Sequence, residues 1–236
     1  MKYDLDTFIR ENRFTISIVF PLVGAFMFLT SYTSILPEIL VYNPYLIIFG
    51  TLVMRTPLIA GLKPLMNKRF LLGLTVLTFY SYIIEYIGAT TGFPYGQFSY
   101  TIDLGPMILG KIPLGLPIFF IPLVLNAYLL ITLLYPEKTR KFFPRVIGVI
   151  ATVLILDLVL DPAAVAVQFW EYSQGVYYGV PLQNYIGWMI SATVAVLVID
   201  QSIDRGKLVD RLESCDFMLD DMVSFVILWG VINLYF

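Results

Sequence analysis

The stretch ILDLVLDPAAVAVQFWEYSQGVYYGVPLQNYIGW, residues 155–188, decides the fold of this chain. It begins inside an apolar run that is too long for a soluble strand, and it carries two acids four residues apart, Asp157 and Asp161. An aromatic, glycine-punctuated loop follows, and Asn184 and Trp188 then head the next apolar run. Acidic side chains inside hydrocarbon are costly and usually functional. We therefore expect this stretch to supply about half of an active site buried in a membrane.

The composition of the whole chain supports this interpretation. Of the 236 residues, 58% are hydrophobic and only 14% are charged, and the mean hydropathy is +0.81. A soluble domain carries roughly 25% charged residues, and a spanning helix needs about 20 mostly apolar ones. The sequence predicts a single integral membrane domain over residues 1–236, an all-α polytopic bundle of about seven transmembrane helices. The apolar runs cover about 14–36, 41–62, 70–90, 107–134, 144–160, 184–203 and 217–236.

Several function classes are excluded by composition. The net charge of −2 provides no basic face for nucleic acid. The absence of histidine excludes haem, copper and histidine-box di-iron chemistry, as well as every histidine-based triad. Cys215 is the only cysteine, so neither an intramolecular disulfide nor a cysteine metal cage can form. No cleavable signal peptide is apparent at the N-terminus, and we expect no metal site and no cofactor.

The basic residues predict the orientation in a cell membrane. They gather before the first run and in every second loop after it, whereas the opposite loops carry only Lys111, and Arg55 lies within the second run. By the positive-inside rule, the N-terminus is then cytoplasmic. The clustered residues are Lys2, Arg10, Arg13, Lys63, Lys68, Arg69, Lys138, Arg140, Lys141, Arg145, Arg205, Lys207 and Arg211. The seventh run is a less clear span because Asp216, Asp220 and Asp221 stand at its start.

The two longest outer loops resemble each other. Each follows a helix that ends near an acid, Glu85 or Asp161, and each is rich in glycine and aromatic residues. A duplicated helix–loop–helix unit would produce this pattern. At ~1.5 Å per residue, Glu85 lies roughly 24 Å above Arg69, and Asp161 roughly 24 Å above Arg145. The two acids are therefore predicted to lie at a similar depth.

Each polar residue also has a purely structural interpretation. Asp161 precedes Pro162, so one interpretation is that it is the N-cap of a short helix over residues 163–170. The other is that it is an acid at a helix break and faces a cavity. Asp157 shares its face if the helix is continuous. It would also be a partner for Arg55, because an arginine inside a membrane needs one.

Two polar stripes and the loop aromatics complete the candidates. One stripe, on the third run, includes Tyr82 and Glu85 at helical spacing, and the other, on the sixth run, includes Asn184, Trp188 and Ser191. Such stripes face a cavity or join helices, and Asn184 would also cap its helix. The aromatics either form the interfacial belt or line a binding site whose ring faces stabilise cations. The aromatic candidates are Phe93, Tyr95, Phe98, Tyr100, Trp170, Tyr172, Tyr177 and Tyr178.

At these residues the sequence resembles a known family. The first half of the pattern is E-x-x-G-x-x-T-G-x-x-Y-G-x-F-x-Y (85–100), followed by L-G-x-P (114–117). The second half is D-P-x(7)-W-E-Y-x-x-G-x-Y-Y-G-V-P-x-x-N-Y-x-G-W (161–188). Both look like the membrane carotenoid-biosynthesis family that includes bacterial carotenoid 1,2-hydratases and haloarchaeal bisanhydrobacterioruberin hydratases. The resemblance covers residues 70–200 well and the ends poorly.

The resemblance implies addition of water to the terminal C=C of an acyclic ψ-end group. In the haloarchaeal case, both ends of bisanhydrobacterioruberin are hydrated to give bacterioruberin. The partners are then a carotenoid within the bilayer and water as co-substrate, and other membrane enzymes of the pathway are candidate partners. The chemistry needs a positioned strong acid and no cofactor, and a carboxylic acid in an apolar site keeps its proton near neutral pH.

The candidate site follows from this chemistry. The catalytic candidates are Asp161, Glu85, Asp157 and Asn184, which would protonate the alkene and hold water. The candidate substrate-binding residues are Tyr82, Tyr95, Trp170, Glu171, Tyr177, Tyr178, Trp188 and Arg55. A carotenoid cyclase or isomerase would share the protonation step. A proton-coupled transporter or a carotenoid-binding membrane protein is the non-enzymatic alternative.

Overall fold

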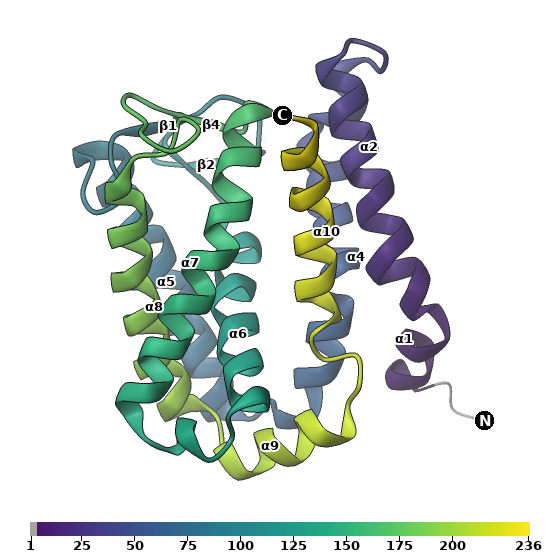
Figure 1. Cartoon of the computed structure of the whole chain (residues 1–236), viewed down its shortest axis with the longest axis vertical. Helices are drawn as coiled ribbons and strands as arrows, with labels where there is room; N and C mark the ends of the chain where they lie inside the picture. The colour runs from purple at the N-terminus through teal and green to yellow at the C-terminus, as the bar shows by residue number, and fades with distance from the viewer. Residues whose placement is uncertain (1–3) are drawn as a thin grey trace.

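The computed structural model describes residues 4–236 as a bundle of upright helices (Figure 1). Within these residues, six helical segments are long and apolar enough to cross a membrane, which confirms the predicted helical membrane bundle. They are Leu5–Tyr32, Glu38–Leu65, Lys68–Thr91, Leu116–Leu134, Phe142–Ala166 and Leu182–Ser202. The predicted seventh span is not confirmed, because the last helix, α10 (Asp220–Tyr235), has only 16 residues.

The helices are joined by short connections except after α5 and α7, where the loops carry the strands. The first segment consists of α1 (Leu5–Phe14), a π-helical turn (Thr15–Val19) and α2 (Phe20–Tyr32), and the second of α3 (Glu38–Val41), α4 (Pro44–Leu62) and a 3₁₀ turn (Lys63–Leu65). The other spans are α5 (Lys68–Thr91), α6 (Leu116–Leu134), α7 (Phe142–Ala166) and α8 (Leu182–Ser202). A 3₁₀ turn (Lys138–Arg140) precedes α7, and α9 (Arg205–Ser214) leads into α10. The strands are β1 (Phe98–Tyr100), β2 (Met107–Ile108), β3 (Ile112–Pro113) and β4 (Trp170–Tyr172).

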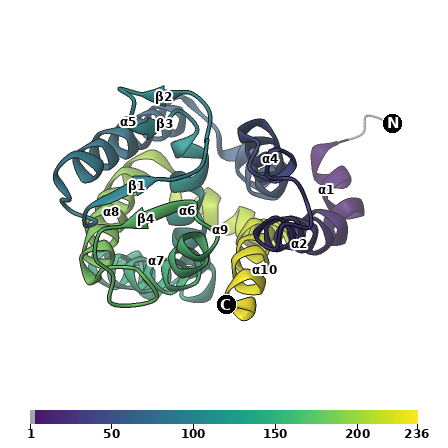
Figure 2. The same cartoon turned by 90° about the horizontal axis from the view of Figure 1, so that it is seen from above.

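The helices form two groups when seen from above (Figure 2). Helices α5, α6, α7 and α8 pack in a ring, each against its neighbours. Helices α1, α2 and α4 form the second group, and α10 packs against α2, α4 and α7. The short strands lie over the α5–α8 group at one end (Figures 1 and 2). Helix α10 therefore joins the two groups.

Local sequence signals set the ends of α5, the helix that carries Glu85. The side chain of Asn67 accepts hydrogen bonds from the backbone N–H groups of Arg69 and Phe70, at 2.9 and 3.0 Å, and so caps its start. Gly92 ends it in the left-handed region, with φ of 78°, which is costly for residues with a side chain. Glu85 consequently lies near the C-terminal end of the helix, toward the strands.

The fourth apolar run does not begin as a helix, contrary to its predicted start near residue 107. Strands β2 and β3 form a small antiparallel hairpin that pairs Met107 with Pro113 and Ile108 with Ile112. Leu109 and Gly110 both have positive φ, 51° and 69°, as a type I′ turn requires. Helix α6 starts only at Leu116. Hydropathy does not distinguish this apolar hairpin from a helical segment.

The predicted helix start at Asp161 is wrong. Helix α7 continues through Asp161 and Pro162, both buried, and ends at Ala166. A proline removes one backbone donor, but a membrane bundle tolerates this where neighbouring groups surround the freed carbonyl. The continuous helix places Asp157 and Asp161 one turn apart on the same face. Beyond it, Gln168 adopts φ of 60°, and the chain turns into β4.

The acids at the start of the seventh run attach α10 to the second group, which contains α1. Asp216 accepts hydrogen bonds from Arg10 and Arg13 of α1. Asp220 is buried and forms an ion pair with Arg13. The Arg13 guanidinium also donates a hydrogen bond to the backbone carbonyl of Asp216 at 2.6 Å. These pairs explain why an apolar helix begins with carboxylates.

The clustered basic residues lie at one end of the bundle. The α4–α5 and α6–α7 connections, α9 and the start of α1 are all at the lower end in Figure 1, whereas β1, β2 and β4 lie at the upper end. Arg211 extends from α9 to the carbonyl of Gly61, at 2.9 Å, at the C-terminal end of α4, where a cation is favoured. Lys2 falls outside the described residues. Which side of the membrane this end faces stays a prediction.

Cysteine labelling will test the orientation. Gln97 and Gln174 are exposed at the strand end, so a cysteine introduced at either position should react with a membrane-impermeant maleimide in intact cells. The native Cys215 is 3% exposed and should contribute little background. A cysteine at Lys138, which lies at the basic end, is the matched control and should react only after lysis. The reverse pattern would contradict a cytoplasmic N-terminus.

Candidate active site

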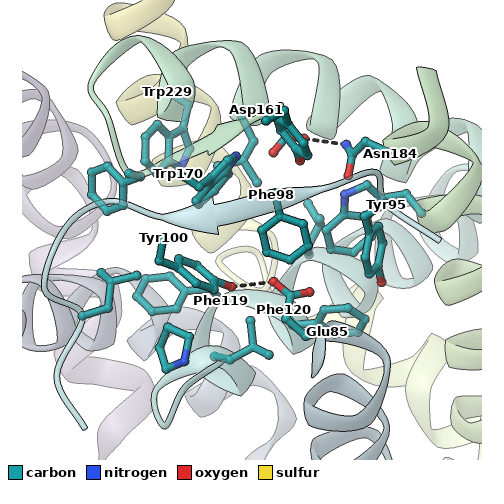
Figure 3. A pocket seen from close by; sticks show the side chains of 18 of the residues that line it. Glu85, Tyr95, Phe98, Tyr100, Phe119, Phe120, Asp161, Trp170, Asn184 and Trp229 are labelled. Atoms are coloured by element: carbon teal, nitrogen blue, oxygen red, sulfur yellow. Dashed lines mark hydrogen bonds between the residues drawn. The ribbon is translucent and has the colours of Figure 1, made fainter. Parts of the chain in front are cut away.

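A cavity of about 110 Å³ lies beneath the strands, at the end of the α5–α8 group that carries them (Figure 3). Aromatic and aliphatic side chains line most of it, and the polar exceptions include Glu85, Asp161 and Asn184. Its volume is several times the roughly 10–15 Å³ that one water molecule needs. The lining is completed by Arg55, Tyr95, Phe98, Tyr100, Leu104, Pro113, Leu116, Phe119, Phe120, Leu123, Leu160, Phe169, Trp170, Tyr172, Trp188, Phe225 and Trp229.

Two strands from separate loops cover the cavity. β1 and β4 pair antiparallel, with Phe98 opposite Tyr172 and Tyr100 opposite Trp170. Side chains alternate between the faces of a strand, so these four aromatics point to one side and line the cavity. The residues between them, Ser99 and Glu171, are exposed on the other side, where the Ser99 hydroxyl donates to Glu171 at 3.2 Å.

Each strand supplies a tyrosine to one of the two membrane acids. The Tyr100 hydroxyl on β1 donates to Glu85 Oε1 on α5, as the dashed line in Figure 3 marks. The Tyr172 hydroxyl on β4 donates to Asp161 Oδ2 on α7 at 3.0 Å. Burial raises the pKa of both tyrosines well above the usual value for this side chain, and the nearby carboxylates raise it further. Both hydroxyls therefore remain protonated donors near neutral pH.

Asn184 joins the two aspartates of α7. Its side-chain nitrogen donates to Asp157 Oδ2 at 2.8 Å and also to Asp161 Oδ2. Asn184 lies within the first turn of α8, whose N-cap is Pro181, so its predicted capping role is wrong. Asp157 is fully buried and does not line the cavity, and its Oδ1 has no hydrogen-bond partner among the described residues. Asp157 therefore lies behind Asp161, which faces the cavity.

The opposite polar stripe, on α8, fixes an aromatic wall. Trp188 stacks on Phe120, with ring centroids 5.1 Å apart and planes at 28°. The Tyr95 hydroxyl lies 2.6 Å from Ser191 Oγ. A Cβ on Gly187 would lie 2.3 Å from the Tyr95 ring, so only glycine allows this close approach. The stripe thus faces the cavity and the loop rather than lipid.

Arg55 does not pair with Asp157, so this predicted partnership is wrong. Its guanidinium bonds Asp221 on α10, and the side-chain nitrogen of Asn126 donates to the other oxygen of Asp221 at 2.6 Å. Arg55 and Asp221 are both buried. The packing explains the choice, because α10 lies beside α4, whereas Asp157 faces α8.

Comparisons with known proteins find similarity over nearly the whole chain. Residues 42–236 match the model of a family described as carotenoid biosynthesis protein. The chain is also 56% identical over 231 residues to the bisanhydrobacterioruberin hydratase of Haloarcula japonica, over 98% of this chain and 79% of that protein.

The chain belongs to the carotenoid biosynthesis protein family. This confirms the resemblance that the two loop motifs carry. The family match includes every residue that lines the cavity, whereas α1 and α2 precede it. No solved structure matches the chain.

In this carotenoid biosynthesis protein, the cavity unites most of the predicted site residues. Glu85, Asp161 and Asn184 line it, as do Tyr95, Trp170, Trp188 and Arg55. Five candidates do not line it, and Asp157, behind Asp161, is the first of them. The Tyr82 hydroxyl donates to the Leu114 carbonyl at 2.6 Å, Glu171 is on the outer face, and Tyr177 and Tyr178 contact each other on an exposed loop. The catalytic and binding roles of all these residues stay predictions.

Sequence reasoning missed the contribution of α10 to the site of this family member. Phe225 and Trp229 line the cavity, and Phe169, just after α7, packs edge-on against Trp229 with centroids 5.6 Å apart. The only available signal was the acidic start of the seventh run, which required a basic partner within the membrane. Arg55, inside the second predicted span, was one candidate partner for these acids.

Proposed function

We propose that this protein is a carotenoid hydratase that adds water to the terminal C=C of an acyclic ψ-end group. The relative from Haloarcula japonica is named for hydration of bisanhydrobacterioruberin, and at 56% identity the same substrate is the best candidate here. Hydration of both ends in turn would yield bacterioruberin. Water is the co-substrate, and we expect no metal or cofactor to take part.

The observation that carries this proposal is the pair of acids in one apolar cavity. Glu85 and Asp161 come from different helices and appear on opposite sides of β1 in Figure 3. Each accepts a hydrogen bond from a tyrosine hydroxyl, and the surrounding walls are mostly aromatic. An alkene end group placed between them would have an acid available for one carbon and a second carboxyl group available for water.

The reaction then balances with water alone. One of the two acids transfers its proton to the less substituted alkene carbon, which forms a C–H bond and leaves a tertiary carbocation. Water forms the C–O bond, and its surplus proton passes to the other carboxylate. Return of that proton to the first acid restores the site, and the net change is addition of one water molecule per end group.

The neighbouring side chains suit these steps. Phe98, Phe120 and Trp188 line the cavity, and an aromatic ring face presented to the cation would stabilise it. Tyr100 and Tyr172 would orient the two carboxyl groups through their hydrogen bonds. Asn184 would hold Asp161 in place through the bond that it also makes to Asp157, so we assign Asn184 and Asp157 as positioning residues.

Isotope labelling tests the reaction class. Purified protein in detergent, given bisanhydrobacterioruberin in ¹⁸O-water, should form a product whose new hydroxyl carries the label, without added metal, nicotinamide, flavin or O₂. A rearranged product of unchanged mass would instead identify a cyclase or an isomerase. Label from ¹⁸O₂, or pigment binding without conversion, would contradict the hydratase proposal.

A further inference from the structure

A second cavity, of about 220 Å³, lies beside the first between α2, α3, α4 and α10. The two cavities share three wall residues, Phe119, Phe169 and Trp229. Among the described residues that line the second cavity, only Thr51 and the indole of Trp229 offer a polar group. The acid-bearing cavity thus adjoins a larger apolar one.

The boundary between the cavities consists of aromatic side chains. Phe169 lies edge-on to Phe28, with centroids 5.2 Å apart, and edge-on to Trp229, at 5.6 Å. Phe28 lines the second cavity only, and Trp229 lines both. Side-chain rotations move such a boundary without breaking a helix, since no main-chain hydrogen bond is involved.

The second cavity opens on the outer surface of the bundle. Val23 of α2 is 50% exposed and Phe49 of α4 is 62% exposed, and both line it, together with the half-exposed Leu40 and Leu46. These residues belong to spanning segments, where an exposed apolar side chain faces lipid. A long apolar molecule could therefore enter sideways from the bilayer.

We propose that this second cavity binds the polyene chain next to the end group that enters the acid-bearing cavity. The inference rests on the proposed function. A rigid, flat hydrocarbon matches an apolar passage with aromatic walls, because it contacts ring faces and needs no polar partner. A two-ended substrate must also insert each end in turn, so the rest of the chain has to extend back into lipid. An opening toward lipid beside the acids meets both requirements.

Gly50 provides the test. It lines the second cavity, and a Cβ built there would lie 3.8 Å from the Phe20 ring, an ordinary contact. Gly50→Leu should therefore fold and fill the passage. Gly230→Leu is the matched control: this glycine is also helical and lines neither cavity, and a Cβ added to it would meet no atom within 4 Å.

Two readouts separate the inference from the proposed function. The first is the amount of carotenoid bound per protein, measured from visible absorbance after purification. Gly50→Leu should bind about tenfold less than wild type, and Gly230→Leu as much as wild type. The second is kcat/KM for the full-length carotenoid against a short acyclic isoprenoid with the same end group. Gly50→Leu should lose about tenfold on the long substrate only.

The outcomes are distinct. Normal pigment binding by Gly50→Leu, an equal loss of kcat/KM on both substrates, or a phospholipid retained there and not displaced by carotenoid would each overturn the inference. Wild-type protein that binds carotenoid but hydrates neither substrate would refute the proposed function instead. The binding readout would still show whether the carotenoid occupies the second cavity.

Discussion

Asp161→Asn and Glu85→Gln should each lower kcat by about 10²–10⁴-fold, the usual contribution of general acid–base catalysis. An amide has nearly the shape of the acid but cannot donate a proton of comparable acidity. Both acids line the cavity, and each accepts a tyrosine hydroxyl that an amide oxygen can also accept. Turnover is measured in detergent from the mass of the pigments formed.

Matched variants make this result specific. Asp103→Asn changes an exposed acid in the loop at the same end, outside the cavity lining, and should keep wild-type turnover. Tyr100→Phe and Tyr172→Phe remove only the hydroxyl beside each acid and should reduce kcat less than the amide changes do. Carotenoid binding and thermal stability in detergent should stay near wild type in both amide variants. Near-normal rates for both would mean that the proton comes from elsewhere.

Arg55→Ala should destabilise the protein by roughly 3–5 kcal/mol, the cost of removing one partner from a buried ion pair. Asp221 would then keep only the Asn126 amide as a partner for its charge, in a fully buried position. The double change Arg55→Ala/Asp221→Ala should recover part of the loss. Unfolding in detergent, followed by circular dichroism, gives the free energies for this double-mutant cycle.

A second cycle provides the control for this pair. Asp157 contacts Asn184 rather than Arg55, so the effects of Arg55→Ala and Asp157→Ala on unfolding should be additive. Coupling between Arg55 and Asp157, with none between Arg55 and Asp221, would reverse the assignment. It would also place α10 differently, because Asp221 joins that helix to Arg55 of α4.

Much of the architecture was predictable from the sequence, because membrane spans are a property of local composition. The apolar runs located the helices, and the alternating basic loops predicted which connections share one end. Residue counting at a constant rise placed Glu85 and Asp161 at one level, and both line one cavity. The loop motifs indicated the family, which the comparisons confirmed.

Only the tertiary structure decided which groups meet. Depth restricts a side chain to a level in the membrane but not to a direction around the helix axis, so it could not choose between Asp157 and Asp221 for Arg55. Strands of three residues carry too little periodicity to be recognised, yet the pairing of β1 with β4 brings Tyr100 to Glu85 and Tyr172 to Asp161. Helical and strand patterns describe one segment at a time, whereas a hydrogen-bond partner depends on how separate segments pack.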